Sequence, residues 1–409
     1  MALPNKPLGE LKAVKDPEVE EREVDILIVG GGMAACGSAF EIKKWAPDKK
    51  ILLVDKAALE RSGAVAQGLS AINTYIGENT PEDYVRMVRN DLMGIVREDL
   101  IYDMGFHVDD SVFLFEEWGL PIWKMSDDGK KLDGKKGQKM GTLKSGATPV
   151  RTGKWQIMIN GESYKRIVAE AAKLALGDEN ILERVFIVKL LLDANEENRI
   201  AGAVGFSVRE NKVFIIKCNT CMVACGGAVN IYQPRSVGEG KGRAWYPVWN
   251  AGSTYTMCME VGAELSMMEN RFTPSRYKDG YGPVGAWFLL FKAKTLNGLG
   301  EGYVGSDAAK AELERYAPYG TAAITPTCLR NHLMLFEMKE GRGPVMMDTV
   351  TALKELGGAV SKKELKALES EAWENFLDMT CGQANLWCGT NTEPDKKTSE
   401  IMPTEPYLL

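Results

Sequence analysis

The chain has 409 residues, of which 45% are hydrophobic and 26% are charged, and its formal net charge is −6. An acidic balance without long blocks of one sign gives no support for nucleic-acid binding, which needs a basic face. The longest apolar runs, such as Ala286–Phe291, are too short to span a membrane, and the charged stretch Met1–Val24 lacks the apolar core of a secretory signal. We therefore expect a cytoplasmic protein of two or three domains without a membrane span.

A strand–helix–strand unit is predicted near the start of the chain. The apolar pattern predicts a strand over Val24–Val29, a helix over Met33–Trp45 and a second strand over Lys50–Lys56. Two strands joined in this way are expected to be parallel, with a right-handed connection. Thr80 then begins another helix, because a proline follows it and acidic residues occupy the first turn.

The middle of the chain predicts a basic loop, a helix and three strands. Residues 127–146 hold six Lys and five Gly, which predicts a solvated loop or hairpin, with a basic partner-binding patch as the alternative. A helix is expected over Tyr164–Leu176. Strands at Arg184–Asp193, Ile200–Val208 and Lys212–Gly227 predict a meander that returns to the main sheet.

The composition of the sequence changes at Glu269, after which Pro, Arg and aromatic residues are interspersed. This change suggests a second, smaller domain. We expect a first domain over residues 1–268 and a second over 269–392. Residues 393–409 are expected to begin a segment that returns to the first domain.

A glycine-rich loop lies between the first strand and the first helix. Its pattern is G-x-G-x-x-A, in which Gly30 allows the tight turn, Gly32 lets the backbone approach a pyrophosphate, and Ala35 allows close packing. The helix start adds free amides and a partial positive charge, both suited to phosphate. Asp55 ends the next strand, where a carboxylate accepts hydrogen bonds from ribose. Together these features predict a dinucleotide site.

The segment Lys56–Gly77 bears on which dinucleotide binds. A wide ring system needs small or polar residues that let it lie against the backbone, and such residues are Ser62, Gly63, Ala64, Ala66, Gln67, Gly68 and Ser70. An NAD-dependent enzyme would normally continue into further strand–helix units here. The composition favours FAD, and a plain Gly/Ala loop is the alternative.

Three cysteines, Cys218, Cys221 and Cys225, form a C-x2-C-x3-C pattern, a spacing that invites a zinc or iron–sulfur interpretation. However, the segment alternates like a buried strand that runs into a Gly turn, and no fourth ligand is near it in the sequence. We expect buried thiols and no metal. Eight cysteines in 409 residues are also too few for a disulfide scaffold, which favours a reducing compartment.

Several motifs resemble the fumarate reductase/succinate dehydrogenase flavoprotein superfamily. They are the glycine loop, "LERSGAVAQG", the strand that ends in "ACGGA" and "GEGKGRAW". The resemblance implies an α/β fold, with a Rossmann-like FAD-binding domain built on a parallel sheet and a β-meander, plus a smaller α+β capping domain. In many members the residue equivalent to Gly63 is a histidine joined to the flavin. Glycine at this position implies that FAD is bound without a covalent link.

Longer motifs are similar to the alpha subunits of dissimilatory adenylylsulfate reductases: "GRAWYPVWNAGSTYTMC", "ENRFTPSRYKDGYGPVGAWFLLFKAK", "PTCLRNHLM" and "SEIMPTEPYLL". This resemblance implies the reversible reduction of adenylylsulfate to sulfite and AMP through a flavin N5–sulfite adduct. It also implies a heterodimer, in which a small beta subunit carries the iron–sulfur clusters. The alternative is a fumarate-, succinate- or aspartate-type enzyme, which is disfavoured because Thr273-Pro274 stands where dicarboxylate enzymes carry His-Pro.

The resemblance also implies the site residues. Arg276 and Arg330 are the candidates for oxyanion binding, because the planar guanidinium binds oxyanions bidentately and stays charged. Gly285 and Leu289 are expected to shape the adenylyl pocket, and Trp245 and Asn73 are expected to lie near the flavin ring, with Arg276, Trp245 and Asn73 assigned to catalysis. The cofactor-binding set is Gly30, Gly32, Met33, Ala34, Asp55, Lys56, Ser62, Gly63, Gln67, Ser70, Phe186, Ile187, Ala224, Gly226 and Trp245.

The family continues beyond "SEIMPTEPYLL" with a Gly-Ser-His loop, a last flavin-binding strand and a helical domain. None of these follows Leu409 in this sequence. We therefore expect a C-terminally truncated chain, and a catalytically incompetent FAD-binding fragment is a second alternative for its function.

Overall fold

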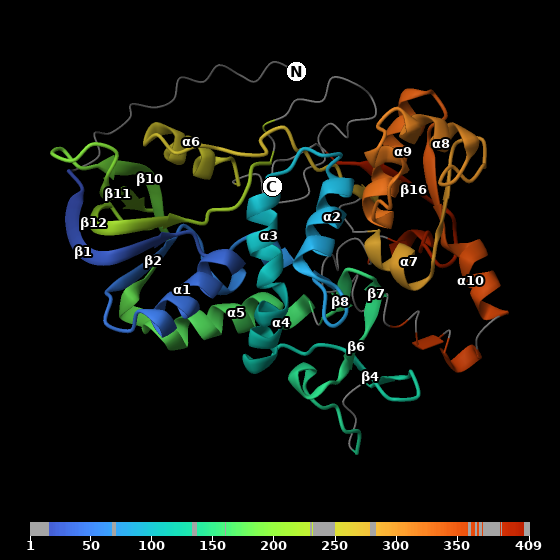
Figure 1. Cartoon of the computed structure of the whole chain (residues 1–409), viewed down its shortest axis with the longest axis horizontal. Helices are drawn as coiled ribbons and strands as arrows, with labels where there is room; N and C mark the ends of the chain where they lie inside the picture. The colour runs from blue at the N-terminus through green and yellow to red at the C-terminus, as the bar shows by residue number, and fades with distance from the viewer. Residues whose placement is uncertain are drawn as a thin grey trace.

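The fold was obtained as a computed structural model (Figure 1). The structure describes residues 16–67, 71–132, 137–159, 161–229, 231, 250–278, 284–358, 361–364, 366–367, 370, 385 and 387–404. Among the helices in these ranges, none is long and apolar enough to cross a membrane.

A six-stranded sheet forms the core of the first part, in the order β10-β11-β12-β1-β2-β9. Its strands are β1 (Glu18–Val29), β2 (Ile51–Asp55), β9 (Ile181–Glu183), β10 (Val185–Leu192), β11 (Ile200–Ser207) and β12 (Lys212–Val223). The strands from β12 to β9 are parallel, whereas β10, β11 and β12 form an antiparallel meander. The predicted fold class, with a parallel sheet and a meander, is confirmed.

The first strand is longer than predicted. It begins at Glu18 rather than Val24, and its polar first half pairs in parallel with β12, with Glu18 opposite Lys212. The Lys212 ammonium lies 3.1 Å from a Glu18 carboxylate oxygen and 3.0 Å from one of Glu20. Cross-strand pairs of opposite charge stabilise a sheet where the strand carries few apolar side chains, so an apolar pattern alone places the start of the strand too late.

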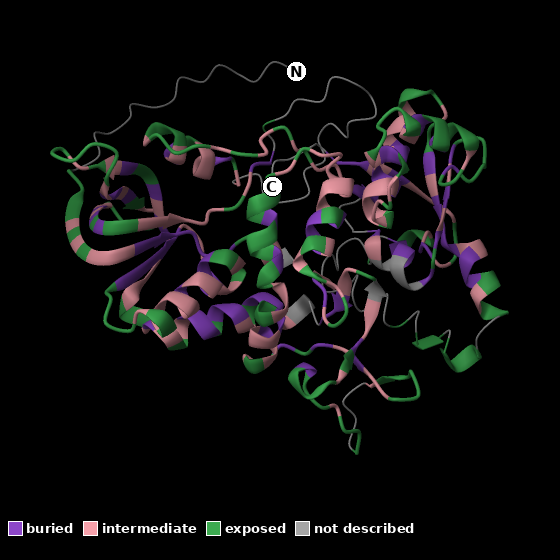
Figure 2. Ribbon diagram, in the orientation of Figure 1, coloured by how far each residue is buried: buried purple, intermediate pink, exposed green. Residues whose placement is uncertain are grey.

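Two helices cover one face of the sheet, as Figures 1 and 2 show. Helix α1 (Met33–Trp45) packs along α5 (Gly161–Leu176), and both bury apolar side chains against alternate residues of β1 and β2. The other face packs against the meander and against α6 (Ser253–Glu260). The strands are therefore buried on both faces, as is usual for parallel sheets.

Smaller elements lie between the main sheet and the second part. The helices are α2 (Pro81–Asp91), α3 (Glu98–Phe106) and α4 (Val108–Glu117), and the strands are β3 (Ala71–Asn73), β4 (Lys124–Met125), β5 (Lys131–Leu132), β6 (Thr148–Pro149), β7 (Arg151–Gly153) and β8 (Gln156–Met158). Short 3-10 turns are η1 (Leu59–Arg61), η2 (Ala64–Gln67), η3 (Leu143–Ser145), η4 (Asp178–Asn180) and η6 (Tyr319–Thr321). Thr80 caps α2 as predicted, because its hydroxyl accepts from the Asp83 amide while the Asp83 carboxylate accepts from the Thr80 amide.

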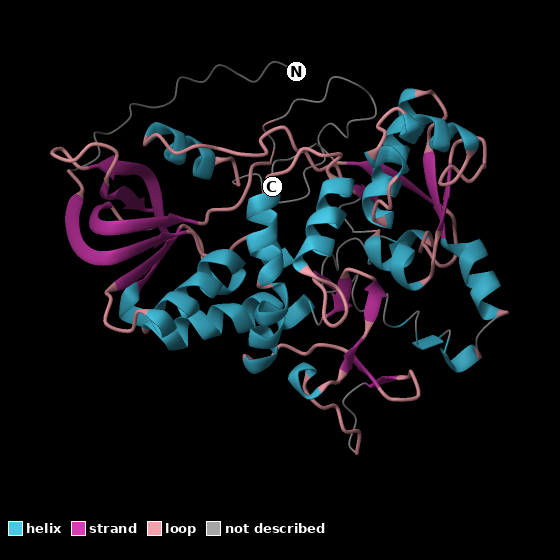
Figure 3. Ribbon diagram, in the orientation of Figure 1, coloured by secondary structure: helices cyan, strands magenta, loops and turns pink. Residues whose placement is uncertain are grey.

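The second part is a four-stranded antiparallel sheet with helices around it (Figure 3). Its elements are β13 (Ser275–Tyr277), α7 (Gly285–Leu290), β14 (Lys294–Leu296), α8 (Asp307–Glu314), α9 (Pro326–Lys339), β15 (Val345–Asp348), α10 (Thr349–Gly357) and β16 (Ser399–Pro403). Strand β16 pairs with both β13 and β15. This strand therefore completes the second sheet, whereas we expected residues 393–409 to begin the return to the first domain.

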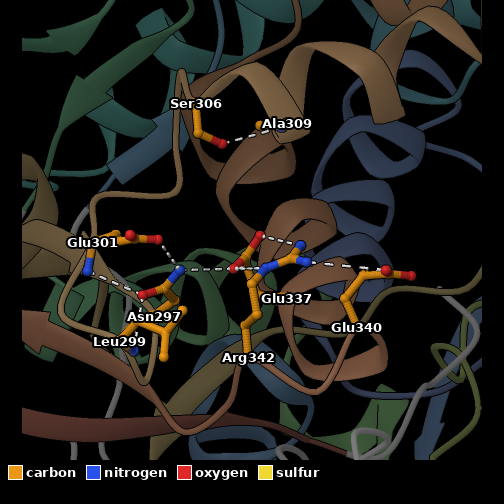
Figure 4. A network of polar contacts seen from close by, with 8 residues as sticks. All are labelled: Asn297, Leu299, Glu301, Ser306, Ala309, Glu337, Glu340 and Arg342. Carbon is orange, nitrogen blue, oxygen red and sulfur yellow. Dashed lines mark hydrogen bonds and ion pairs between the residues drawn. The ribbon is translucent and has the colours of Figure 1, made fainter.

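A buried polar network fixes one corner of the second part (Figure 4). The Glu337 side chain, only 2% exposed, accepts two hydrogen bonds of 2.8 Å from the Arg342 guanidinium. It also accepts from the Asn297 amide at 3.1 Å, and the Asn297 oxygen accepts from the backbone amides of Leu299 and Glu301. The network joins the end of α9 to the loop after β14.

Asp91, at the end of α2, links the two parts. Its carboxylate accepts 2.7 Å hydrogen bonds from both the amide and the hydroxyl of Thr325, the residue before α9. The Asn270 side chain also donates from its Nδ2 to the carbonyl of Ile95 at 2.9 Å. Because α9 also carries Arg330, these contacts help to place the second part relative to the helices of the first.

Candidate functional site

The glycine loop sits where the parallel strands end, between β1 and α1. Gly30 has a φ of +119°, and a Cβ there would lie 2.3 Å from the Ala224 carbonyl oxygen. Its amide donates to the Val54 carbonyl at 2.8 Å, and the Ala224 amide donates to the Val29 carbonyl at 2.7 Å. The ends of β1, β2 and β12 are therefore drawn together at a residue that must be glycine.

Asp55 lies directly behind this loop. Its side chain is buried, and its Oδ2 accepts from the Ala57 amide at 3.1 Å. A Cβ on Gly31 would come within 2.5 to 2.7 Å of the Asp55 carboxyl group. The acidic residue predicted to bind ribose is thus held against the loop predicted to bind the pyrophosphate.

The turn after β2 closes the other side of the loop. Gly63 has a φ of +83°, and a Cβ there would lie 3.0 Å from the Cα of Gly32. Ser62, just before it, is buried, and Lys56 places its ammonium 5.2 Å from the centre of the Phe186 ring. The structure therefore brings Gly32, Ser62 and Gly63 into one cradle at the start of α1, which also carries Met33 and Ala34.

The end of β12 forms the third wall of the cradle. Gly226 has a φ of +75°, and its carbonyl accepts from the Thr254 hydroxyl at 2.9 Å. Ala224 contacts Gly30 as described above. Ile187, by contrast, packs its side chain into the core beneath the meander, so only its backbone remains to face a ligand.

The predicted oxyanion residue Arg330 lies on α9 in the second part. Its side chain is buried, with the guanidinium carbon 4.0 Å from the centre of the Phe288 ring on α7. Burial lowers the pKa of Arg330 to about 10. Within the described part of the chain, its Nε has no hydrogen-bond acceptor. A desolvated cation of this kind is stabilised by a bound anion.

Arg276, the other oxyanion candidate, lies on β13 and is buried as well. Its Nη1 donates to the Ser275 carbonyl at 2.9 Å. The Ser275 hydroxyl in turn donates to the Asn331 side-chain oxygen at 2.6 Å. The Ser275–Asn331 hydrogen bond therefore joins β13 to α9, the two elements that carry the arginines.

The remaining predicted residues are spread more widely. Gly285 begins α7, where an added Cβ would meet nothing within 4 Å. Asn73 is exposed at the end of β3, and its side-chain oxygen accepts from the Tyr84 hydroxyl at 2.9 Å. Ser70, Trp245 and the side chains of Gln67 and Leu289 lie outside the described residues.

Sequence reasoning did not identify two residues that the structure places at these sites. Phe288 carries the Arg330 guanidinium on its ring, and Lys165 lies behind the glycine loop. The aromatic run around Phe288 gives no periodic signal. Lys165, within the predicted helix, looks like any surface lysine, because burial of an isolated charge has no local sequence signature.

The thiols of the cysteine cluster differ in their pKa, since the hydrogen bond with Cys221 lowers the pKa of Cys218 while the pKa values of the other two thiols are raised. Hydrogen bonding to Cys218 and burial raise the pKa of Cys221, and burial raises that of Cys225 to about 11. The Cys225 thiol donates to the Val29 carbonyl at 3.3 Å. Across the described ranges, no group of three or more His, Cys, Asp or Glu residues is arranged to hold a metal ion.

The chain matches the FAD binding domain family over residues 25–279. It is 64% identical to the adenylylsulfate reductase subunit alpha of Megalodesulfovibrio gigas, over the whole chain and 62% of that protein's length. It superimposes on adenylylsulfate reductase from the hyperthermophilic Archaeoglobus fulgidus with a TM-score of 0.84 at 52% identity, covering 96% of this chain and 59% of that one. A structure of adenosine-5-phosphosulfate reductase with sulfite as a covalent adduct gives a TM-score of 0.83, with the same identity and coverage. The chain thus spans about three fifths of the length of these proteins.

Proposed function

Because the chain belongs to the FAD binding domain family, we propose that it is the flavoprotein part of an adenylylsulfate reductase. In this proposal FAD binds without a covalent link, and adenylylsulfate is converted reversibly to sulfite and AMP. The likeness to the alpha subunit over the whole chain supports the substrate. The observation that carries it in the structure is the buried Arg330 guanidinium on the Phe288 ring.

The cradle around the glycine loop fits FAD. Side chains are excluded at Gly30 and Gly31 by the closeness of Ala224 and Asp55, so bare backbone faces the ligand. No described side chain caps the start of α1, which leaves the first amides of the helix for a pyrophosphate. Asp55 is placed for the ribose. When bound, FAD would supply the pair of electrons that the reduction of sulfur requires.

The arginines would hold the anionic substrate. Adenylylsulfate carries a phosphate and a sulfate. The planar guanidinium group of an arginine can donate two parallel N–H hydrogen bonds to either of these oxyanions. Arg330 is already desolvated and held against Phe288, so little reorganisation is needed when an oxyanion arrives. The space at Gly285, on the same helix as Phe288, leaves room beside this position for the adenylyl group.

The histidines do not favour a dicarboxylate enzyme. The chain has two of them. His107 is exposed, 3.7 Å from Asp110, and His332 is 3.4 Å from Glu312 on α8. Each therefore faces a nearby carboxylate rather than the glycine loop, which weakens the case for a histidine that binds fumarate or succinate.

Electrons would have to reach the flavin from outside, and we propose that a small iron–sulfur subunit delivers them. We also place the protein in the reducing cytoplasm, on the basis of its low cysteine content. The partner can be tested by mixing the chain with such a subunit and following flavin reduction by stopped-flow absorbance. The expected result is a reduction rate that saturates with subunit concentration. A rate independent of the subunit would contradict the proposed partner.

The main test of the function is the visible spectrum of the purified, FAD-loaded chain. Sulfite is expected to bleach the flavin band, and AMP is expected to change the sulfite concentration required. Arg330→Met should weaken the response to sulfite by roughly a hundredfold or more. Arg315→Met, which removes an exposed arginine directly after helix α8, should leave the response unchanged. A yellow protein indifferent to sulfite would count against the sulfur chemistry.

A further inference from the structure

Lys165 is a buried lysine behind the glycine loop. It lies in the second turn of α5, and only 2% of it is exposed. Lysine is almost never fully buried without a charged partner. Its position is therefore unusual enough to call for a physical reason.

The ammonium group of Lys165 contacts both walls of the cofactor cradle. It donates to the carbonyl of Leu59, in the turn that leads to Gly63, and it lies 3.7 Å from the Cys36 sulfur on α1. The Cys36 thiol in turn donates to the carbonyl of Gly31 at 3.6 Å. A continuous chain of contacts thus runs from the ammonium to the phosphate loop.

Among the described residues, no carboxylate forms a close ion pair with this ammonium. Two acidic groups act on it from a longer distance: Glu60, which forms an ion pair with Lys173, and Asp55, which accepts from the Ala57 amide. A lone buried ammonium is costly unless a counter-charge is close. The other side of the glycine loop is where the pyrophosphate of a dinucleotide binds.

We infer that Lys165 is a positioning residue for the dinucleotide, whose ammonium compensates the pyrophosphate charge through the glycine loop and holds the Leu59 turn in place. The two roles act together. The Leu59 turn sets the approach of Gly63 to Gly32, and the ammonium adds a fixed positive charge behind the same loop. This role concerns the cofactor alone and does not depend on the sulfur chemistry.

The protonation behaviour of the site agrees with this role. Burial lowers the pKa of Lys165 in the ligand-free protein, while Asp55 and Glu60 act in the opposite direction. The other titratable groups that face it are Cys36, whose pKa burial raises, and Lys173, whose pKa the Glu60 carboxylate raises. A bound pyrophosphate would raise the pKa of Lys165 further, so binding at high pH should be accompanied by proton uptake.

The test compares Lys165→Met with Lys173→Met in the apoprotein. Lys173 lies two turns further along α5 and is more exposed, and its charge is already paired with Glu60, which makes it a matched control. FAD binding is measured by fluorescence quenching, and ADP and adenosine are titrated as competitors. Lys165→Met should weaken the binding of FAD and of ADP by the same factor, about tenfold to a hundredfold. The affinity for adenosine should stay within about twofold of the wild-type value. Lys173→Met should change all three by less than about threefold.

A second measurement does not depend on a stable variant. Calorimetric titration of the wild-type apoprotein with ADP, in buffers of different ionisation enthalpy, should reveal proton uptake that grows as the pH rises toward the ordinary lysine pKa of 10.5. If Lys165→Met weakened the binding of ADP and of adenosine equally, Lys165 would have only a structural role. The absence of proton uptake in the wild-type protein would refute the charge compensation directly.

Discussion

Replacing Gly30 with alanine tests the geometry of the glycine loop most directly. The new Cβ would lie 2.3 Å from the Ala224 carbonyl oxygen and 2.6 Å from its carbon, against a practical limit of 3.0 Å. The end of β12 must therefore move by about 0.7 Å, although two hydrogen bonds of 2.7 and 2.8 Å hold the strand ends together.

The cost can be assembled from separate contributions. An alanine at φ of +119° adds roughly 1–2 kcal/mol of backbone strain, and weakening the two hydrogen bonds adds about 0.5–1.5 kcal/mol each. We expect the free energy of unfolding to fall by about 3 kcal/mol, and FAD binding to weaken by at least about a hundredfold. Urea denaturation gives the first quantity and FAD titration the second.

Gly37→Ala is the matched control for this substitution. Gly37 lies within α1, and an added Cβ would meet nothing within 4 Å. The same chemical change should therefore stabilise the protein by about 0.5–1 kcal/mol, because alanine favours a helix. If Gly30→Ala left both stability and FAD binding within the range of Gly37→Ala, the close approach of β1 and β12 would not exist in solution.

Three further substitutions and one pH dependence can be tested in the same way. Arg276→Ala should lower turnover in a reconstituted enzyme about a hundred- to a thousand-fold, with steady-state kinetics as the measurement. Glu337→Gln should cost about 2 kcal/mol in urea denaturation, because it removes the buried carboxylate that accepts two hydrogen bonds from the Arg342 guanidinium. The Arg342 hydrogen bonds hold the pKa of Glu337 below its ordinary 4.5. The pair's contribution to the free energy of unfolding is therefore complete above pH 4.5 and is lost as the pH falls through the lower pKa of the folded state. In acid, the wild-type protein should lose its greater stability relative to Glu337→Gln. Thr80→Ala should remove about 1 kcal/mol of stability, visible as a lower thermal midpoint.

Much of the first part of the fold could be predicted because its signals are local. Helix α1 begins and ends at the predicted residues, and α2 follows its predicted cap. The start of β1 was missed because its stabilising partner, Lys212 on β12, is distant in the sequence. Strand β16 was assigned elsewhere for the same reason, since only its pairing with β13 and β15 places it in the second sheet.

The site shows the same division between local and distant information. Gly30, Gly32 and Asp55 were predicted as cofactor-binding residues because the loop, the helix start and the strand end are consecutive along the chain, and this role stays a prediction. The contact between Arg330 and Phe288, and the burial of Lys165, depend on how helices pack. A sequence reveals that a lysine is present, but the desolvation that gives it a role arises only from the assembled fold.

The pairing of β1 with β12 has a consequence for synthesis of the protein. Val29 pairs with Val223, so the first strand waits for a partner made about 190 residues later. At about 5–20 residues per second, a ribosome needs on the order of 10–40 s to make the intervening chain. During that interval the edge of β1 is unpaired, and the charged side chains in the first half of the strand disfavour pairing with other chains. The close contact between Gly30 and Ala224 can likewise form only after Ala224 has emerged, so this wall of the glycine loop is completed late in synthesis.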